Sequence, residues 1–347
     1  MTDNDPIEEF LRSLDAHSAQ SVERVQILRS VVTRFVELAE GDPDDGDLRV
    51  AATVLGEILE AAAVFAPWRN RSKLTVFGSA RTAPGTALYT MAHDLAQMMA
   101  ARGWITVSGA GPGIMAAAAQ GAGRENTLGV NILLPFEQSS NEFIDAETRL
   151  VEMKYFFTRK VALTKESHAF AVFPGGLGTH DELFEILTLL HTGKSDPAPL
   201  VLIDTPDGSY WEQWRAFILD AVVAGGYLEA SDLCLATVCH SLEEAVDEIE
   251  RFHSNYVRFS VTGERGHVVL RRAPTPSELT HLAQAVPLFA TGRGFEFDGD
   301  QTLSFSFDAR SYVALRTLID EVNRWPAPLV SGAQEHLGFQ QASPDFG

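Results

Sequence analysis

Apolar residues near the start of the chain recur at helical spacing. In the segment Val22–Leu38 they fall three or four residues apart, and a second run with the same period extends over Leu48–Phe65. A polar segment with glycine and proline, residues 41–46, separates the two runs. We therefore predict an N-terminal helical extension over residues 1–70, which would pack or dimerise without chemistry of its own.

Between Leu74 and Phe252 the pattern changes to short apolar runs that alternate with longer helical ones. Such alternation is typical of βαβ units and a parallel sheet. The fold class we predict is α/β, with a doubly wound, parallel, Rossmann-like sheet in a domain over residues 71–253. Its expected strands are Leu74–Val76, Ile105–Val107, Leu128–Leu133, Ala169–Phe173 and Leu200–Ile203. Ligands of such sheets bind beyond the carboxyl ends of the strands.

A third pattern begins after Asn255 and predicts a small α+β domain over residues 254–347. Its expected strands and helices are Tyr256–Val261, His267–Leu270, a helix from Pro276, Thr302–Phe307 and a helix over Arg310–Arg324. We expect the tail after Pro326 to be loose, as chain ends often are.

Charge and composition narrow the choice of function. The 347 residues carry a formal net charge of −20, and 45% of them are hydrophobic. This charge argues against nucleic acid as the main partner, because neutralising phosphates needs a surface of lysine and arginine. We find no apolar run that would span a membrane and no signal peptide, so we expect no membrane partner and a cytoplasmic location. The two cysteines, Cys234 and Cys239, are predicted to be core thiols.

Three glycine loops follow three predicted strands: the first glycine loop, Phe77–Arg81, the second, Ser108–Gly113, and the third, Pro174–Thr179. Glycine allows tight turns and a close approach of the backbone. A helix that starts at such a turn directs N–H groups and a positive dipole end toward an anion. Three such loops at one sheet edge predict a pocket of nucleotide size.

Charged side chains near the third glycine loop suggest what the pocket does. Glu182 lies early in the helix that follows, where a carboxylate would face the pocket and stabilise a cation or position water. Arg159 precedes the strand that leads into this loop, and arginine suits bidentate phosphate contacts. Asp181 and Glu185 are interpreted as complementing the helix dipole. His180 is predicted to be an exposed helix-start histidine rather than a base contact.

The segment Pro174–Glu182 reads PGGLGTHDE and matches the PGGxGTxxE motif of the LONELY GUY family, formerly labelled lysine decarboxylases. Arg159 and Lys160 match that family's upstream Arg-Lys pair at the family's spacing. The chain resembles the long-form branch over about Leu74–Phe252. Further matching segments are Phe77–Arg81, Gly111–Met115, Asn131–Gln138 and Phe157–Lys160.

This resemblance implies a phosphoribohydrolase. It would release a free base and ribose 5-phosphate from a nucleoside 5′-monophosphate, either AMP or an N6-modified AMP such as a cytokinin nucleotide. No metal or other cofactor is implied, and the chain would form a homodimer. The resemblance assigns catalysis to Arg159 and Glu182. The residues expected to contact phosphate or substrate are Gly78, Ser79, Gly111, Gly113, Met115, Asn141, Lys160, Gly175, Gly176, Leu177, Gly178, Thr179 and Thr188.

The sequence also departs from the family pattern. Relatives tend to have glycine at Ala110, a Glu-Ala-Ala-Asn run at Ala116–Ala119 and an apolar residue at His180. These changes leave cytokinin nucleotides, plain AMP and a pyrimidine monophosphate open as substrates. The alternative function is a non-catalytic carrier of a nucleotide or of the molybdenum cofactor, and the presence of both Arg159 and Glu182 argues against it. A regulatory assembly in which the terminal domains sense another nucleotide stays open alongside catalysis.

Overall fold

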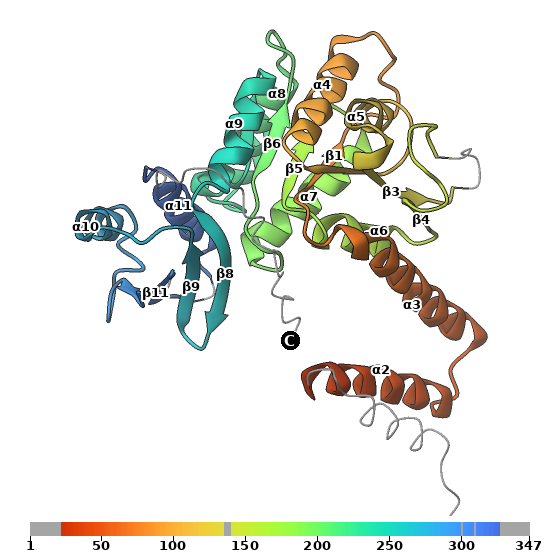
Figure 1. Cartoon of the computed structure of the whole chain (residues 1–347), viewed down its shortest axis with the longest axis horizontal. Helices are drawn as coiled ribbons and strands as arrows, with labels where there is room; N and C mark the ends of the chain where they lie inside the picture. The colour runs from red at the N-terminus through yellow and green to blue at the C-terminus, as the bar shows by residue number, and fades with distance from the viewer. Residues whose placement is uncertain (1–21, 135–139, 300, 309, 327–347) are drawn as a thin grey trace, which may run out of the picture. The chain divides into compact units, whose positions relative to one another are not determined.

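The structure is a computed structural model that describes residues 22–134, 140–299, 301–308 and 310–326 (Figure 1). The predicted loose tail after Pro326 lies outside the described residues. Residues 135–138, at the end of the family-like segment Asn131–Gln138, also lie outside them. The chain divides into two compact units, Met1–Gly56 and Glu57–Gly347. The predicted domain boundaries at residues 70 and 253 stay predictions.

Two helices occupy the N-terminal region as predicted, α2 (Val22–Glu40) and α3 (Asp45–Phe65), and the short 3-10 helix η1 (Ala66–Trp68) follows. One helical stretch is long and apolar enough to cross a membrane by length and composition alone, although it contains no continuous apolar run of that length. The helical stretch Asp45–Trp68 has 24 residues, and its mean hydropathy reaches 1.6. Its many alanines raise that mean without forming one run of large apolar residues. Length and composition alone are weak evidence, because core helices of soluble proteins pass the same test.

Seven parallel strands form the central sheet in the order β4-β3-β2-β1-β5-β6-β7. The five predicted strands are confirmed, and two edge strands, β4 and β7, were missed. Edge strands are harder to recognise because β4 has an exposed glutamate in its middle and β7 has three residues. The strands are β1 (Lys73–Phe77), β2 (Ile105–Ser108), β3 (Thr127–Ile132), β4 (Leu150–Met153), β5 (Ala169–Val172), β6 (Leu200–Ile203) and β7 (Thr237–Cys239).

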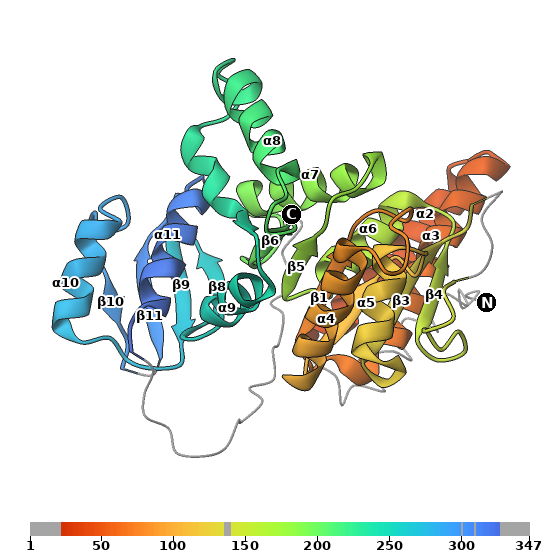
Figure 2. The same cartoon turned by 90° about the horizontal axis from the view of Figure 1, so that it is seen from above.

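Helices cover both faces of this sheet, which confirms the doubly wound fold (Figure 2). Side chains along β5 alternate between the faces, since Phe170 and Val172 pack with α6, α7 and α8, while Ala169 and Ala171 pack with α4, α5 and α9. The helices are α4 (Ala87–Ala101), α5 (Ile114–Ala122), α6 (Phe156–Lys165), α7 (Leu177–Thr192), α8 (Tyr210–Phe217) and α9 (Leu242–Phe252). Shorter helical segments are η2 (Arg124–Asn126), η3 (Ile218–Val223) and η4 (Ala230–Leu235).

Strand order places the binding edge. From β1 the chain moves outward through β2, β3 and β4, and it then returns to the other side of β1 with β5, β6 and β7. The loops after β1 and β5 therefore diverge at the point where the strand order reverses. Open α/β sheets bind ligands at this switch point.

A second sheet follows, antiparallel and four-stranded, in the order β10-β11-β9-β8. It has its own hydrophobic core, and α11 contacts both α7 and α9. The α+β composition predicted for this region is confirmed. Its elements are β8 (Tyr256–Thr262), β9 (Arg265–Leu270), α10 (Pro276–Ala285), β10 (Glu296–Phe297), β11 (Thr302–Ser306) and α11 (Tyr312–Asn323).

The two cysteines have different surroundings. Cys239 is buried at the end of β7, where burial raises the pKa of its thiol to about 12. Cys234 is exposed in η4, so the prediction that both are core thiols was wrong for this residue. A short surface helix places single apolar residues outward, and sequence alone does not separate that case from a core position.

Candidate functional site

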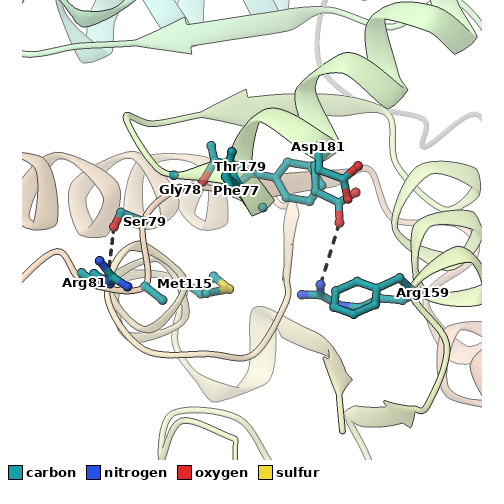
Figure 3. Close-up of a pocket in the computed structure, with 14 residues that line it drawn as sticks. Phe77, Gly78, Ser79, Arg81, Met115, Arg159, Thr179 and Asp181 are labelled. Carbon is teal, nitrogen blue, oxygen red and sulfur yellow. Dashed lines mark hydrogen bonds and ion pairs between the residues drawn. The ribbon is translucent and has the colours of Figure 1, made fainter. Parts of the chain in front are cut away.

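A cavity of about 640 Å³ lies at the switch point (Figure 3). The first glycine loop forms one side and the start of α7 another, while α6 contributes an arginine. Its lining residues are Phe77, Gly78, Ser79, Ala80, Arg81, Met115, Phe156, Arg159, Gly176, Leu177, Gly178, Thr179, Asp181 and Glu182. A space of this size accommodates a nucleoside monophosphate.

The first and third glycine loops are joined directly. The Ser79 amide donates to the Pro174 carbonyl over 3.2 Å. A Cβ atom at Gly175 would lie 2.1 Å from Thr179 Oγ1, so glycine is needed for the loop to close on the first turn of α7. The two loops therefore present one continuous backbone surface to the cavity.

Three successive carbonyls of the third glycine loop, those of residues 174–176, accept hydrogen bonds from the protein. Their donors are the amides of Ser79 and His180 and the Tyr210 hydroxyl. Because the N–H and C=O of a trans peptide point in opposite directions, the amides that follow these carbonyls point the other way. Within the described ranges, no protein acceptor pairs with the amide of Gly176 or Leu177. This arrangement suits an anion at the N-terminus of α7.

Arg159 reaches the cavity from α6, and its side chain is 12% exposed. Its Nε donates to the Val130 carbonyl on β3 over 2.9 Å. A Cβ atom at Gly109 would fall 1.9 Å from Arg159 Nη2. The missing side chain at Gly109 therefore makes room for the guanidinium.

Glu182 faces Arg159 across the cavity, with Arg159 Nη1 3.8 Å from Glu182 Oε1. The glutamate is 5% exposed, and no described residue donates a hydrogen bond to its Oε2. Burial raises the pKa of Glu182, while the charges of Arg159 and Lys160 oppose that rise. A buried carboxylate oxygen without a partner is well placed to bind a sugar hydroxyl, a water molecule or a developing positive charge.

Lys160 points to α7 rather than into the cavity lining. Its Nζ lies 2.8 Å from Asp181 Oδ1 and 3.4 Å from Glu185 Oε2. Burial would lower the pKa of Lys160, but the hydrogen bond to Asp181 and the surrounding carboxylates raise it. The lysine thus ties α6 to α7, beyond the dipole role that we predicted for Asp181 and Glu185.

The buried end of α3 also fixes α6. Glu57 accepts the Lys154 amide over 2.6 Å, and its other carboxylate oxygen accepts the Thr158 hydroxyl. These bonds tie the residue before α6 and a side chain in its first turn to α3, and so hold the helix that carries Arg159.

The structure brings together most of the residues predicted from the family motifs. Those that line the cavity are Gly78, Ser79, Met115, Arg159, Gly176, Leu177, Gly178, Thr179 and Glu182. Those that lie outside its lining are Gly111, Gly113, Asn141, Lys160, Gly175 and Thr188. Their roles, like those of the lining residues, stay predictions.

Two of the outlying residues make other contacts. Asn141 donates from Nδ2 to the carbonyls of Ala110 and Gly111, each over 3.1 Å, and so holds the second glycine loop. Thr188 is exposed on α7 and donates to the Phe184 carbonyl within its own helix.

Sequence reasoning missed five lining residues: Phe77, Ala80, Arg81, Phe156 and Asp181. Arg81 ends the first glycine loop and adds a second cation to the cavity, a position suited to phosphate. The motif Phe77–Arg81 already contained this signal. Phe156 is half exposed at the start of α6, where it offers an aromatic surface to a base.

His180 is not the exposed histidine that we predicted. It is half-buried among aromatic rings, with ring centroids 5.9 Å from Tyr210, 6.1 Å from Trp211 and 6.3 Å from Phe184. Two of these partners come from α8, some thirty residues further on, so local sequence gave no indication of them.

The fold and this cavity define the class of protein: a doubly wound α/β protein with a glycine loop at a helix start, beside a largely buried arginine and a buried glutamate. In the described part of the chain, no group of three or more His, Cys, Asp or Glu residues could hold a metal ion. A family model described as "Possible lysine decarboxylase" matches residues 113–249.

Two named relatives and one solved structure resemble parts of this chain. The cytokinin riboside 5′-monophosphate phosphoribohydrolase of Mycobacterium tuberculosis is 29% identical over 163 residues, which cover 46% of this chain and 83% of the relative. The probable cytokinin riboside 5′-monophosphate phosphoribohydrolase LOGL1 of Oryza sativa subsp. japonica is 30% identical over 202 residues, covering 56% and 86%. A solved molybdenum cofactor binding protein from Rippkaea orientalis is 19% identical, with a TM-score of 0.38 over 52% of this chain and 96% of that one.

The chain belongs to the family of the cytokinin riboside 5′-monophosphate phosphoribohydrolases, which confirms the resemblance to the LONELY GUY family. The names of these relatives support hydrolytic activity at the level of the family.

Proposed function

We propose that this chain hydrolyses the N-glycosidic bond of a nucleoside 5′-monophosphate, AMP or an N6-modified AMP such as a cytokinin nucleotide. The products are the free base and ribose 5-phosphate. The observation that carries the proposal is the buried pair Arg159 and Glu182, 3.8 Å apart, beside the amides of the third glycine loop. A loop that binds phosphate would serve a carrier equally well, whereas a buried carboxylate with an unsatisfied oxygen serves glycosidic chemistry.

The 5′-phosphate would bind at the third glycine loop, with Thr179 and Arg81 as further ligands. Both residues line the cavity together with the loop amides. Helix N-termini bind phosphates through exactly oriented N–H groups and the helix dipole, so the strongly negative net charge of the chain need not prevent binding. Nucleosides without a phosphate should then be poor substrates.

The chemical step requires a group that tolerates positive charge on the ribose. As the bond from C1′ to the base nitrogen breaks, its electron pair leaves with the base and C1′ becomes cationic. The Glu182 carboxylate stabilises this charge and accepts a proton from the water whose oxygen bonds to C1′. The base nitrogen takes up one proton overall. Arg159 positions the ribose phosphate or stabilises the departing base.

A panel of nucleoside monophosphates tests this function. The chain is incubated with AMP, an N6-modified AMP, GMP, CMP and UMP, and free base and ribose 5-phosphate are measured separately. We expect the two products in equal amounts from AMP or its N6-modified form. Tight binding of a monophosphate without release of base would contradict the proposal and favour a carrier.

We also propose that the chain forms a homodimer. Four large apolar side chains near the cavity are exposed, namely Phe156, Phe157, Val161 and Leu177. Such a patch on α6 and α7 fits a protein interface better than bulk water. Light scattering should give twice the chain mass, and a monomer at micromolar concentration would contradict this proposal.

A further inference from the structure

His180 and Tyr210 make three contacts on the carbonyl side of the third glycine loop. The Tyr210 hydroxyl donates to the Gly175 carbonyl over 2.5 Å. The His180 ring places Nδ1 3.1 Å from the Gly176 carbonyl and Nε2 3.4 Å from the Tyr210 hydroxyl oxygen. The two side chains therefore hold two neighbouring peptides of the loop from one side.

The three contacts fit one arrangement. The Tyr210 hydroxyl uses its one proton for the Gly175 carbonyl. The Gly176 carbonyl can only accept, so Nδ1 of His180 donates to it. Nε2 of the same ring lies against the Tyr210 oxygen, so the two side chains support each other.

We propose that His180, acting through Tyr210, is a positioning residue for the third glycine loop. The pair keeps the carbonyls of Gly175 and Gly176 turned away from the cavity, so that the following amides stay available to a phosphate. This inference rests on the proposed role of the loop in binding the 5′-phosphate. A peptide that flipped here would direct a carbonyl oxygen at the anion.

The other charged groups near the ring have partners of their own. Asp181, the next residue on α7, binds Lys160. Asp204 accepts the first amide of α8 and the Thr205 amide. Glu212 on α8 lies 3.7 Å from the ring of His240. The His180 ring therefore contacts the loop and Tyr210, and among the described residues no carboxylate is in hydrogen-bond contact with it.

Four variants make the test specific. His180→Leu removes the ring contacts. His180→Asn places an amide nitrogen where Nδ1 lies, so it can donate to Gly176 but does not reach Tyr210. Tyr210→Phe removes the hydroxyl. His191→Asn, at the far end of α7, is the matched control, because it removes a histidine that lies 3.5 Å from Asp232 and away from the loop.

Binding of AMP by calorimetry and turnover of AMP are measured for each variant. We expect His180→Leu and Tyr210→Phe to weaken AMP binding about tenfold while kcat changes less than about twofold. His180→Asn should recover part of this loss, because its amide can still donate to the Gly176 carbonyl. The double variant that combines His180→Leu and Tyr210→Phe should bind AMP at most about twofold more weakly than His180→Leu alone, because both side chains act on one loop. Equal affinity of wild type and His180→Leu would overturn the inference.

Nitrogen-15 spectra of the His180 ring, recorded without ligand, separate this inference from the proposed function. Tyr210→Phe should move the Nε2 signal more than the Nδ1 signal, because Nε2 lies against the Tyr210 hydroxyl. Failure to hydrolyse AMP with these spectra intact would refute the proposed function alone. Spectra that do not respond to Tyr210→Phe would overturn the inference whatever the activity.

Discussion

The second and third glycine loops flank the same central strand, because each follows one neighbour of β1, namely β2 or β5. Both loops are glycine-rich, and both precede a helix. The third glycine loop contributes four residues to the cavity lining, and α7 adds two more beyond the loop. Of the described residues that belong to the second glycine loop, none is part of that lining.

The second glycine loop contacts other side chains of the protein rather than the cavity. Gly109 leaves space for the Arg159 guanidinium, and Asn141 holds the carbonyls of Ala110 and Gly111. A glycine indicates that something comes close to the backbone, and the sequence does not say whether this is a ligand or a side chain. The comparison therefore separates a loop that binds substrate from a loop that positions a catalytic group.

The largest effect on turnover is expected at Glu182, which lies on the helix that follows the third glycine loop. Glu182→Gln keeps the shape but removes the negative charge, so kcat for AMP should fall about 1,000-fold. AMP affinity, measured by calorimetry, should stay within about threefold. Unchanged turnover with intact binding would show that the carboxylate is not used in the reaction.

A methyl group in each loop should separate their roles. In Gly109→Ala the added carbon would meet Arg159, so the guanidinium must move and kcat should fall about 100-fold. Gly178→Ala is the matched variant in the cavity lining, where an added Cβ meets no protein atom within 4 Å. It should raise KM more than it lowers kcat. Equal effects of both variants on kcat would remove the distinction between the loops.

The pH profile of turnover tests how the surrounding charges set the pKa of Glu182. Turnover needs the Glu182 carboxylate, so it should decline as pH falls through a pKa that burial has raised. Lys160 lowers this pKa, while Asp181 and Glu185 raise it. Lys160→Met should therefore move the acidic limb of kcat to higher pH by about 0.5 unit. Both proteins share the same substrate ionisation, so a limb that stays in place or moves to lower pH would contradict the assignment.

The smallest effect is expected where the second glycine loop is held. Asn141→Ala removes two side-chain donations to loop carbonyls and the bond that Oδ1 accepts from the Phe143 amide. Urea unfolding should show a loss of about 2 kcal/mol. Asn141→Asp keeps the acceptor but turns a carboxylate oxygen toward the two carbonyls, so it should lose at least as much stability. Wild-type stability of Asn141→Ala would mean that the loop holds its shape without this residue.

Much of the central fold could be predicted from the sequence. Strands buried on both faces are continuously apolar, as in β5 and β6, and such runs are easy to recognise. The edge strands β4 and β7 lack that signature. The membrane-length apolar helix Asp45–Trp68 was missed for the opposite reason, because many small residues make a segment apolar without an obvious run.

The candidate site was also predictable only in part from the sequence. Arg159 and Glu182 could be predicted because they belong to a motif with fixed spacing, and the structure brings them together. The partners of His180 and the neighbour of Gly109 depend on contacts between distant parts of the chain. No local sequence pattern encodes such contacts, so only the structure reveals them.

A competition between AMP and adenosine in one reaction tests the central account most directly, because it asks for glycosidic cleavage and for phosphate recognition at once. Adenine, ribose 5-phosphate and ribose are measured together over time. The account predicts that AMP is consumed at least about 100-fold faster per unit concentration, with ribose 5-phosphate as the sugar product. Equal consumption of the two substrates, or no release of adenine from AMP, would contradict it.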